Sequence, residues 1–480
     1  MAHASSEGEF DLVIRGGTVV LPEGPAEIDV GVRGEHIAAL APGLPPGRKD
    51  VPARGRIVLP GGVDSHCHMD QPPWEGRSTA DDFNSGTLSA LCGGTTTVIP
   101  FAMQMRGQSL RAAVDDYHER ARSKAHIDYG FHLIIGDPTE KVLKDEIPRL
   151  VAEGCTSFKI YLTYEGLKLD DYEVLNVLDV ARSEGAMVMV HAENDACIRW
   201  LTERFLAARK TQLRYHGLAH PEIGDREATF RAISLAELVE TPLLISHVSA
   251  AGAVEEIRRA KARGLPVYAE TCPQYLFLTS EDMDTPDLSG AMCVCTPPPR
   301  HRSNQPEIWR GIFDGTLEVF SSDHSPWNYA DKIAGGPDVP FTRIPNGIPG
   351  IETRLPLLYS AGVNMDRLSL LKFAELTAAN PARLFGLYPR KGAIALGSDA
   401  DLAIWDPARE VTITNAMLHH ATDHTPYEGR VVRGWPVATI SRGDVVWNDG
   451  QITSMPGRGR FLACNRPFTP KQDLPPVLAS

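Results

Sequence analysis

Histidine and aspartate side chains that can bind metal ions stand at the ends of several short apolar runs. His66 and His68 are two residues apart, so in a β-strand both imidazoles would point to the same face. His191, His247 and Asp323 each end a different apolar run. A single buried histidine is common in protein cores. Four histidines and an aspartate at the ends of four strands instead indicate a metal site that several strands build together.

Lys159 lies in the middle of another apolar run, residues 157–161. Strand alternation sends Phe158 and Ile160 to one face and Lys159 to the other, toward the expected site. A buried, unpaired ammonium is costly and tends to lose its proton. Two interpretations stay open: the lysine head reaches water, or a neutral amine captures carbon dioxide as a carbamate. The carbamate would be an anion able to bridge two metal ions.

The segments that carry these residues alternate between strand and helix. The runs expected to be strands are 62–66, 95–99, 127–133, 157–161, 187–191, 243–247, 266–270 and 318–323. The helix-like stretches between them include 81–91, 110–124, 170–184, 226–239 and 250–262. This α/β alternation predicts a closed (β/α)₈ barrel with its site at the C-terminal strand ends. A doubly wound open sheet is the alternative, which the lack of a Gly-rich phosphate fingerprint disfavours.

Both ends of the chain have the pattern of short β-strands separated by Gly, Pro and charged turns. The strand-like runs are 10–14, 18–21, 27–32 and 36–40, then 402–405, 411–413, 437–440 and 444–447. Neither set is large enough alone, so we expect the two ends to pair into one small β-sandwich. The predicted organisation is residues 1–59 and 391–480 as the sandwich with an extended tail, and 60–390 as the barrel.

Composition excludes several classes of protein. The 480 residues are 42% hydrophobic and 23% charged, as in ordinary globular proteins. The net charge of −13 argues against a nucleic-acid partner, because such proteins neutralise phosphates with Lys and Arg. No apolar run approaches the roughly 18 residues of a membrane span. Residues 1–9 lack signal-peptide features and the eight cysteines are scattered, so we expect a cytoplasmic protein without membrane contact.

Together these motifs resemble the amidohydrolase superfamily, and within it the dihydropyrimidinase/hydantoinase group. The stretches that carry the resemblance are 61–68 (GGVDSHCH), 157–159 (SFK), the run ends at 191 and 247, and 322–324 (SDH). Supporting stretches are 79–83, 93–97, 296–298, 345–347, 387–392 and 397–402. The resemblance therefore covers nearly the whole chain. Tyr164, Thr296 and Asn346 in their contexts favour the narrower group.

The resemblance implies a centre of two divalent metal ions, with zinc as the usual ion and manganese as the alternative. The implied ligands are His66 and His68 with Asp323 on the more buried ion, His191 and His247 on the other, and carbamylated Lys159 bridging both. A hydroxide that bridges the metals would attack the cyclic amide. Asp323 would act as the proton shuttle to the leaving nitrogen.

The resemblance also implies roles around the substrate ring. Tyr164 would donate a hydrogen bond to the developing oxyanion, and main-chain groups of Thr296 and Asn346 would hold the imide edge. The implied substrates are small cyclic ureides, dihydropyrimidines or 5-substituted hydantoins, which open to N-carbamoyl amino acids. Trp74 is a candidate contact for the ring substituent. The implied assembly is a homotetramer.

Two other functions stay open. An allantoinase or dihydroorotase-like activity is the first, because residues 350–356 resemble those relatives, although Tyr164 favours the hydantoinase group. A non-catalytic scaffold of the same fold is the second. Such scaffolds have lost metal ligands, whereas this sequence keeps a suitable side chain at all six positions, which favours an enzyme.

Overall fold

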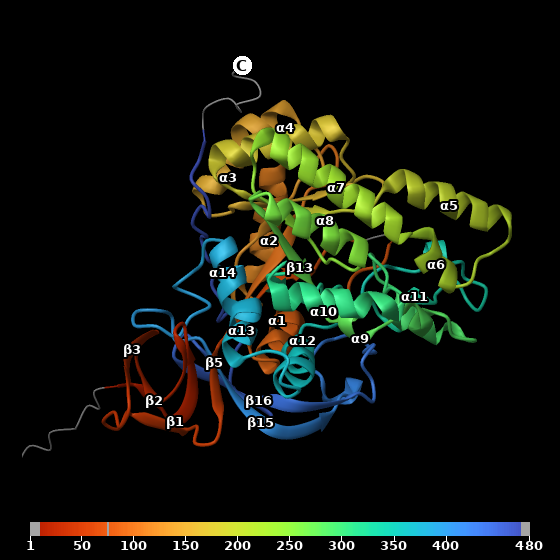
Figure 1. The fold of residues 1–480 in the computed structure, drawn as a ribbon. Helices are drawn as coiled ribbons and strands as arrows, with labels where there is room; N and C mark the ends of the chain where they lie inside the picture. The colour runs from red at the N-terminus through yellow and green to blue at the C-terminus, as the bar shows by residue number, and fades with distance from the viewer. Residues whose placement is uncertain (1–9, 74–75, 472–480) are drawn as a thin grey trace, which may run out of the picture.

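The computed structural model describes residues 10–73 and 76–471 (Figure 1). Two nine-stranded sheets organise the described chain, a central one of parallel strands and one built by both chain ends. The central strands are β6 (Gly62–Cys67), β7 (Thr95–Met103), β8 (Asp128–Tyr129), β9 (His132–Ile134), β10 (Ser157–Tyr161), β11 (Met187–His191), β12 (Leu243–Ile245), β13 (Val267–Thr271) and β14 (Val319–Phe320). The strands of the chain ends are β1 (Leu12–Leu21), β2 (Gly24–Arg33), β3 (His36–Ala41), β4 (Lys49–Pro52), β5 (Ile57–Pro60), β15 (Leu402–Thr412), β16 (Val431–Ser441), β17 (Asp444–Asn448) and β18 (Gln451–Ile452).

Helices surround the central sheet. They are α1 (Phe83–Cys92), α2 (Leu110–Arg122), α3 (Ile147–Ala152), α4 (Asp171–Glu184), α5 (Asp195–Ala207), α6 (Arg214–Ala219), α7 (Glu222–Val239), α8 (Ala251–Ala262), α9 (Gln274–Phe277), α10 (Gln305–Asp314), α11 (Tyr329–Lys332), α12 (Arg354–Leu358), α13 (Leu370–Ala374) and α14 (Asn380–Leu384). The signals at α4 explain its bounds. Asp170 and Glu173 form a capping box at its start, and Gly185 ends it in the left-handed conformation.

The central strands form the predicted (β/α)₈ barrel. Their order runs from β14 through β13, β12, β11, β10, β9 and β7 to β6, with β8 on β7, and the pairings are parallel. The ring closes where the chain after β14 meets β6: the Asp323 amide donates to the His66 carbonyl at 2.8 Å, and the His68 amide to the His324 carbonyl at 2.7 Å. This closure brings the C-terminal ends of the first and last strands together.

Two strands are shorter than the sequence predicts. β12 ends at Ile245 and β14 at Phe320, whereas strands to residues 247 and 323 were expected. Both His247 (φ 37°) and Asp323 (φ 49°) adopt the left-handed conformation, which cannot continue a β-strand. The candidate ligands therefore lie just beyond the strands, on turns that the strands position.

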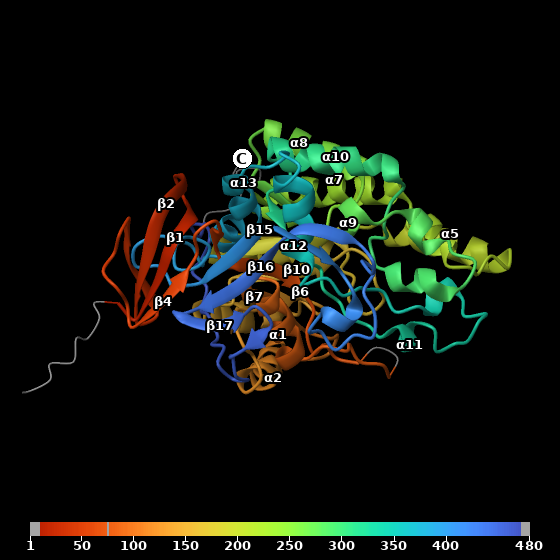
Figure 2. The ribbon, with the colours of Figure 1, turned by 90° about the horizontal axis from the view of Figure 1, so that it is seen from below.

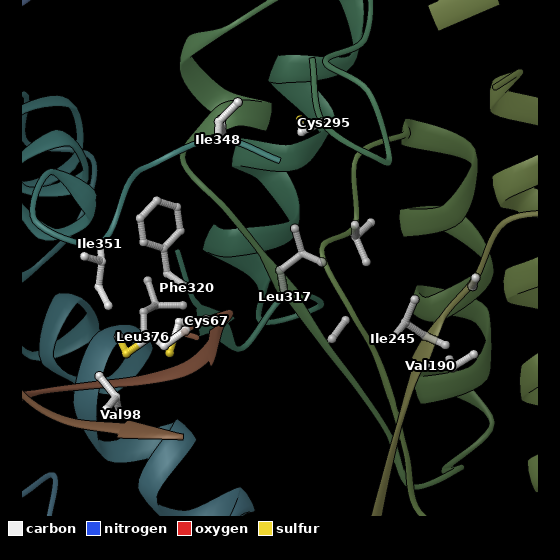
Figure 3. Packing of buried hydrophobic residues seen from close by; sticks show 14 of the residues in the cluster. Cys67, Val98, Val190, Ile245, Cys295, Leu317, Phe320, Ile348, Ile351 and Leu376 are labelled. Atoms are coloured by element: carbon white, nitrogen blue, oxygen red, sulfur yellow. The ribbon is translucent and has the colours of Figure 1, made fainter. Parts of the chain in front are cut away.

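The core packs on both faces of the barrel wall. Every residue of β6, β10 and β11 is buried, as expected for parallel strands covered by helices. Figure 3 shows Cys67 beside Val98 and Leu376, within one hydrophobic cluster. Because alternation places Cys67 on the opposite face of β6 from His66, this packing leaves His66 to face the interior.

The chain ends pair through β5. It pairs with β1 in parallel, and with β15 in the antiparallel sense. The prediction of a barrel with a small β-domain from both chain ends is thus confirmed. Figure 2, a view from below, shows the paired strands β15 and β16 in front of the barrel, while β1 and β2 lie to one side. Among the described residues, none of the helices has the length and apolar character that a membrane crossing needs.

Candidate metal centre and substrate pocket

Three of the predicted ligands form a tight group at the closure of the barrel. The Nε2 atoms of His66 and His68 each lie 3.3 Å from Oδ1 of Asp323. Two ligands that share a tetrahedral zinc ion, with bonds of about 2.0–2.1 Å, lie about 3.3 Å apart. These donor atoms are therefore spaced as ligands of one ion would be. Their chemistry, two imidazoles and a carboxylate, suits a divalent metal.

His191 and His247 stand next to this group at the ends of β11 and β12. Their ring centroids are 4.5 Å apart, and the His247 ring lies 5.2 Å from that of His66. Burial lowers the pKa values of His66, His191 and His247. These rings are therefore neutral near pH 7, which is the form of imidazole that binds a metal.

Lys159 is completely buried on β10, so its head does not reach water. Its Nζ atom has no hydrogen-bond partner among the described residues, and it lies 5.4 Å from the ring centroid of Phe101 and 5.5 Å from that of Tyr161. Burial lowers the pKa of Lys159 to about 8, although the carboxylates of Glu270 and Asp323 favour its charged form. An unpaired amine of this kind is a nucleophile that can accept an acyl group.

Buried carboxylates orient the site. Glu270, at the end of β13, contacts Nδ1 of His66. This contact leaves Nε2 facing Asp323. Asp64 accepts hydrogen bonds from the amides of His66 at 3.3 Å and Ser322 at 3.1 Å, which ties β6 to the turn that carries Asp323.

Sequence reasoning missed a third carboxylate, Glu193. It accepts a hydrogen bond from Nε2 of His191 at 2.7 Å and is buried. The signal was present, because Glu193 lies two residues after a strand-end histidine. His216 and His220 were also missed, since they lie on helix α6 and in the turn after it and only the fold brings them to the site.

The site opens into a cavity of about 450 Å³. All the predicted site residues line this cavity except Lys159, namely His66, His68, Tyr164, His191, His247, Thr296, Asp323 and Asn346. Further lining residues are polar, such as His216 and His220, or apolar, such as Met103, Ile198 and Phe341. A cavity of this size holds a small ring with a substituent. Trp74, expected near the substituent, lies outside the described residues.

Tyr164 is held in a strained backbone conformation at the cavity wall. Its φ is 75°, in the left-handed region that a bulky residue rarely adopts. Its hydroxyl makes a hydrogen bond with the Thr296 side chain. Burial raises the pKa of Tyr164, so the hydroxyl stays protonated and can donate at neutral pH. The Thr296 hydroxyl also lies 3.4 Å from Nε2 of His216.

Asn346 presents oxygen acceptors at the cavity. Its main-chain carbonyl accepts a hydrogen bond from Nε1 of Trp327 at 3.1 Å, which fixes the turn. Its Oδ1 atom is buried without a hydrogen-bond partner in the described part of the chain. A buried acceptor without a partner is costly. An N–H group of a bound ring would satisfy it.

Comparison with known proteins gives a consistent result. Residues 57–446 match the sequence model of the amidohydrolase family. The D-hydantoinase of Rhizobium radiobacter is 42% identical over 454 residues, covering 94% of this chain and 98% of that protein. The D-phenylhydantoinase of Escherichia coli O1:K1 is 42% identical over 465 residues, covering 96% and 99%.

Solved structures agree with the sequence comparisons. The dihydropyrimidinase from Brevibacillus agri superposes with a TM-score of 0.93 at 39% identity, covering 95% of this chain and 99% of that one. The L-hydantoinase from Arthrobacter aurescens superposes with a TM-score of 0.87 at 28% identity, covering 95% and 100%.

Proposed function

Since the chain belongs to the dihydropyrimidinase/hydantoinase group of the amidohydrolase family, we propose that it hydrolyses the cyclic amide bond of dihydropyrimidines or 5-substituted hydantoins. The products are N-carbamoyl amino acids. The single observation that carries this proposal is the group of His66, His68 and Asp323. Its donor atoms have the spacing of ligands to one ion, and they face a cavity of a size that fits such a ring.

As an amidohydrolase the protein binds divalent metal, and we propose two ions, with zinc favoured over manganese. His66, His68 and Asp323 would hold one ion, and His191 with His247 the other. The neutral state of the buried histidines supports this assignment. When bound, such ions lower the pKa of a water and polarise the carbonyl of the scissile amide.

We propose that carbamylated Lys159 is the bridging ligand. Its neutral amine would add to carbon dioxide, forming an N–C bond and releasing one proton, which gives an anion with two oxygens. The support is the burial of Nζ without a hydrogen-bond partner and its pKa of about 8. The reaction would replace a destabilising amine by a group that two cations satisfy.

The remaining chemistry belongs to side chains of the cavity. Asp323 would accept the proton of the attacking water and deliver it to the ring nitrogen as the amide bond breaks. Gln274 lies 3.4 Å from its Oδ2 atom and helps to hold the carboxylate. Tyr164 would donate to the oxyanion. Thr296 and Asn346 would hold the imide edge of the ring.

A turnover panel tests the proposal. The metal-loaded protein would be assayed with dihydrouracil, hydantoin, both enantiomers of 5-phenylhydantoin, allantoin and dihydroorotate, and the products identified by mass. We expect N-carbamoyl products from the first three ring types, with the D-enantiomer preferred, because the relatives at 42% identity are named D-hydantoinases. Turnover of allantoin or dihydroorotate alone would contradict the proposal and favour that alternative activity.

We further propose a homotetramer in the cytoplasm. The resemblance to the hydantoinase group implies this assembly, and large apolar side chains are exposed at Trp200 on α5 (53%) and Phe230 on α7 (59%), where a partner subunit would cover them. All eight cysteines are free thiols, which suits a reducing compartment. Light scattering should give four times the mass of one chain, and a monomeric mass would contradict the assembly.

A further inference from the structure

Glu193 joins two histidines that line the cavity. Its Oε2 atom lies 2.7 Å from Nε2 of His191, and its Oε1 atom lies 2.9 Å from Nδ1 of His220. Glu193 and His191 are 1% and 2% exposed, and His220 is buried as well. Both His191 and His220 line the cavity. Each oxygen of one carboxylate therefore accepts a hydrogen from a different cavity histidine.

This arrangement determines which ring nitrogen of His191 carries the proton and which one can bind a metal ion. An ionised carboxylate only accepts hydrogen bonds, so the nitrogen that faces it must carry the proton. Nε2 of His191 is then the N–H donor, and Nδ1 is left as the nitrogen with a lone pair. His66 is held in the opposite sense, because Glu270 contacts its Nδ1 atom and leaves Nε2 facing Asp323.

A buried arginine anchors the carboxylate. Arg300 lies with Nη2 3.9 Å from Oε1 of Glu193 and 2.5 Å from Oδ2 of Asp225. Its Nε atom donates to Ser249 at 3.0 Å, and it also donates to the His220 carbonyl. Glu193 and Ser249 each lie two residues after a candidate ligand histidine. The turns after β11 and β12 are thus fixed to one another through Arg300.

We propose that Glu193 is a positioning residue that fixes the tautomer of His191 for the second metal ion, with His220 and Arg300 holding Glu193 in place. This inference rests on the proposed two-ion function. A carboxylate partner on the far nitrogen also raises the basicity of the ligating one, so its loss typically weakens metal binding 10–100-fold. Among the described residues, the hydrogen bonds and ion pairs of Glu193 go to His191, His220 and Arg300 and not to His66, His68 or Asp323, so the first ion should be unaffected.

The test is a zinc titration of the metal-free protein against a competing chelator, which yields two dissociation constants. In Glu193→Gln the amide accepts only one hydrogen bond and turns its NH₂ group toward the other histidine. We expect one dissociation constant to rise about 10–100-fold and the other to stay unchanged. Glu203→Gln, at an exposed position on α5, is the matched control and should leave both unchanged.

A double variant separates positioning from general damage. His191→Asn alone should weaken the same ion, and Glu193→Gln added to it should cause no further loss, because both act through one ligand. Two unchanged dissociation constants in Glu193→Gln would overturn the inference, as would loss of the remaining ion in the double variant. If Glu193→Gln does not fold, His220→Asn takes its place. It removes the anchor and should weaken the same ion, and unchanged constants would again overturn the inference.

The wild-type titration keeps the two proposals distinguishable. If the wild-type protein binds fewer than two ions, the proposed two-ion function fails. If it binds two and Glu193→Gln binds them equally well, only the role of Glu193 fails. Melting temperatures of the metal-free variants provide the fold control, since positioning of an ion ligand predicts no large change without metal.

Discussion

Both the backbone conformation and the side-chain position of Asp323 are fixed by its surroundings. Its backbone lies in the left-handed region, and its Oδ1 atom lies 3.3 Å from both His66 and His68. Strained backbone conformations of non-glycine residues persist where the surroundings enforce them, often at active sites. The turn therefore places this carboxylate where it can face both an ion and the substrate, which is what a proton shuttle requires.

Replacement of this carboxylate tests that role. Asp323→Asn keeps the shape of the side chain but cannot take up a proton, so turnover should fall about 10²–10⁴-fold. The melting temperature should stay close to that of the wild type. Steady-state kinetics and circular dichroism check both expectations, with metal content measured in parallel. Near-normal turnover would mean that another group moves the proton.

Lys159 predicts a pH dependence for assembly of the centre. Only the neutral amine reacts with carbon dioxide, and burial lowers its pKa to about 8. Below that pH the amine is mostly protonated and above it mostly neutral. Reactivation of the metal-free protein by zinc should therefore become faster as pH rises through about 8, measured at constant dissolved carbon dioxide.

A matched variant controls that experiment. Lys159→Arg keeps a positive charge that is not lost in this range, so it should not reactivate at any of these pH values. Reactivation that slows as pH rises through 8, or that succeeds in Lys159→Arg, would contradict carbamylation.

At the scale of elements, one loop contact supports the turn after β14. His324 follows Asp323, and its Nε2 atom lies 3.0 Å from Oδ2 of Asp81, just before α1. The other oxygen of Asp81 accepts from the Ala421 amide at 2.8 Å. The amides of Gly350 and Ile351 donate to the remaining ring nitrogen of His324. These contacts hold the turn that carries Asp323 in place.

Asp81→Asn should loosen this turn. The amide can accept from only one of the two donors, and a buried donor left without a partner costs about 1–3 kcal/mol of unfolding free energy. Denaturant titration should show that loss, and turnover should fall while metal content is unchanged. Asp116→Asn, on the exposed face of α2, is the control: it removes a charge from a surface ion pair with Arg120 and should change stability little. Equal stability of the two variants would contradict the role of Asp81.

The sequence predicted the elements well where apolar periodicity is strong. The runs at 157–161 and 187–191 match β10 and β11 to the residue, because both strands are wholly buried. The run 127–133 is instead divided into β8 and β9, with Gly130 donating to the Val98 carbonyl at the break. The pattern of apolar residues cannot predict such a local change of hydrogen-bond partner.

The candidate site was predictable in part for the same reason. The C-terminal ends of all strands meet at one end of a (β/α)₈ barrel. The candidate ligands could therefore be predicted from their positions at strand ends and from the resemblance. His220 and Arg300 did not, because they reach the site from loops whose course depends on tertiary packing. The left-handed backbone of Tyr164 also leaves no mark in composition or spacing.

At the scale of the whole molecule, a buried ion cluster joins the barrel to the chain-end sheet. Lys391 is 1% exposed, and its Nζ atom lies 2.7 Å from Asp128 of β8, 2.7 Å from Asp401 and 3.0 Å from Asp399. Arg442, just after β16, adds a contact of 3.1 Å to Asp128. One cation thus neutralises carboxylates from both parts of the molecule.

Lys391→Met should lower the free energy of unfolding without changing the metal site. Removing one partner leaves buried carboxylates uncompensated, which typically costs about 3–5 kcal/mol. Chemical denaturation should show this loss, with metal content preserved under native conditions. Lys144→Met, which breaks an exposed pair with Glu140, should change stability little. A similar loss of stability in both variants would show that the buried cluster does not stabilise the contact between the barrel and the chain-end sheet.

The proposed activity depends most on a centre of two ions held by the six predicted side chains. Anomalous diffraction from crystals of the zinc-loaded protein measures this directly. We predict two peaks, one between His66, His68 and Asp323 and one beside His191 and His247, with carbamate density on Nζ of Lys159 between them. A single peak, or two peaks with no density extending from Lys159, would show that the protein has no carbamate-bridged centre of two ions.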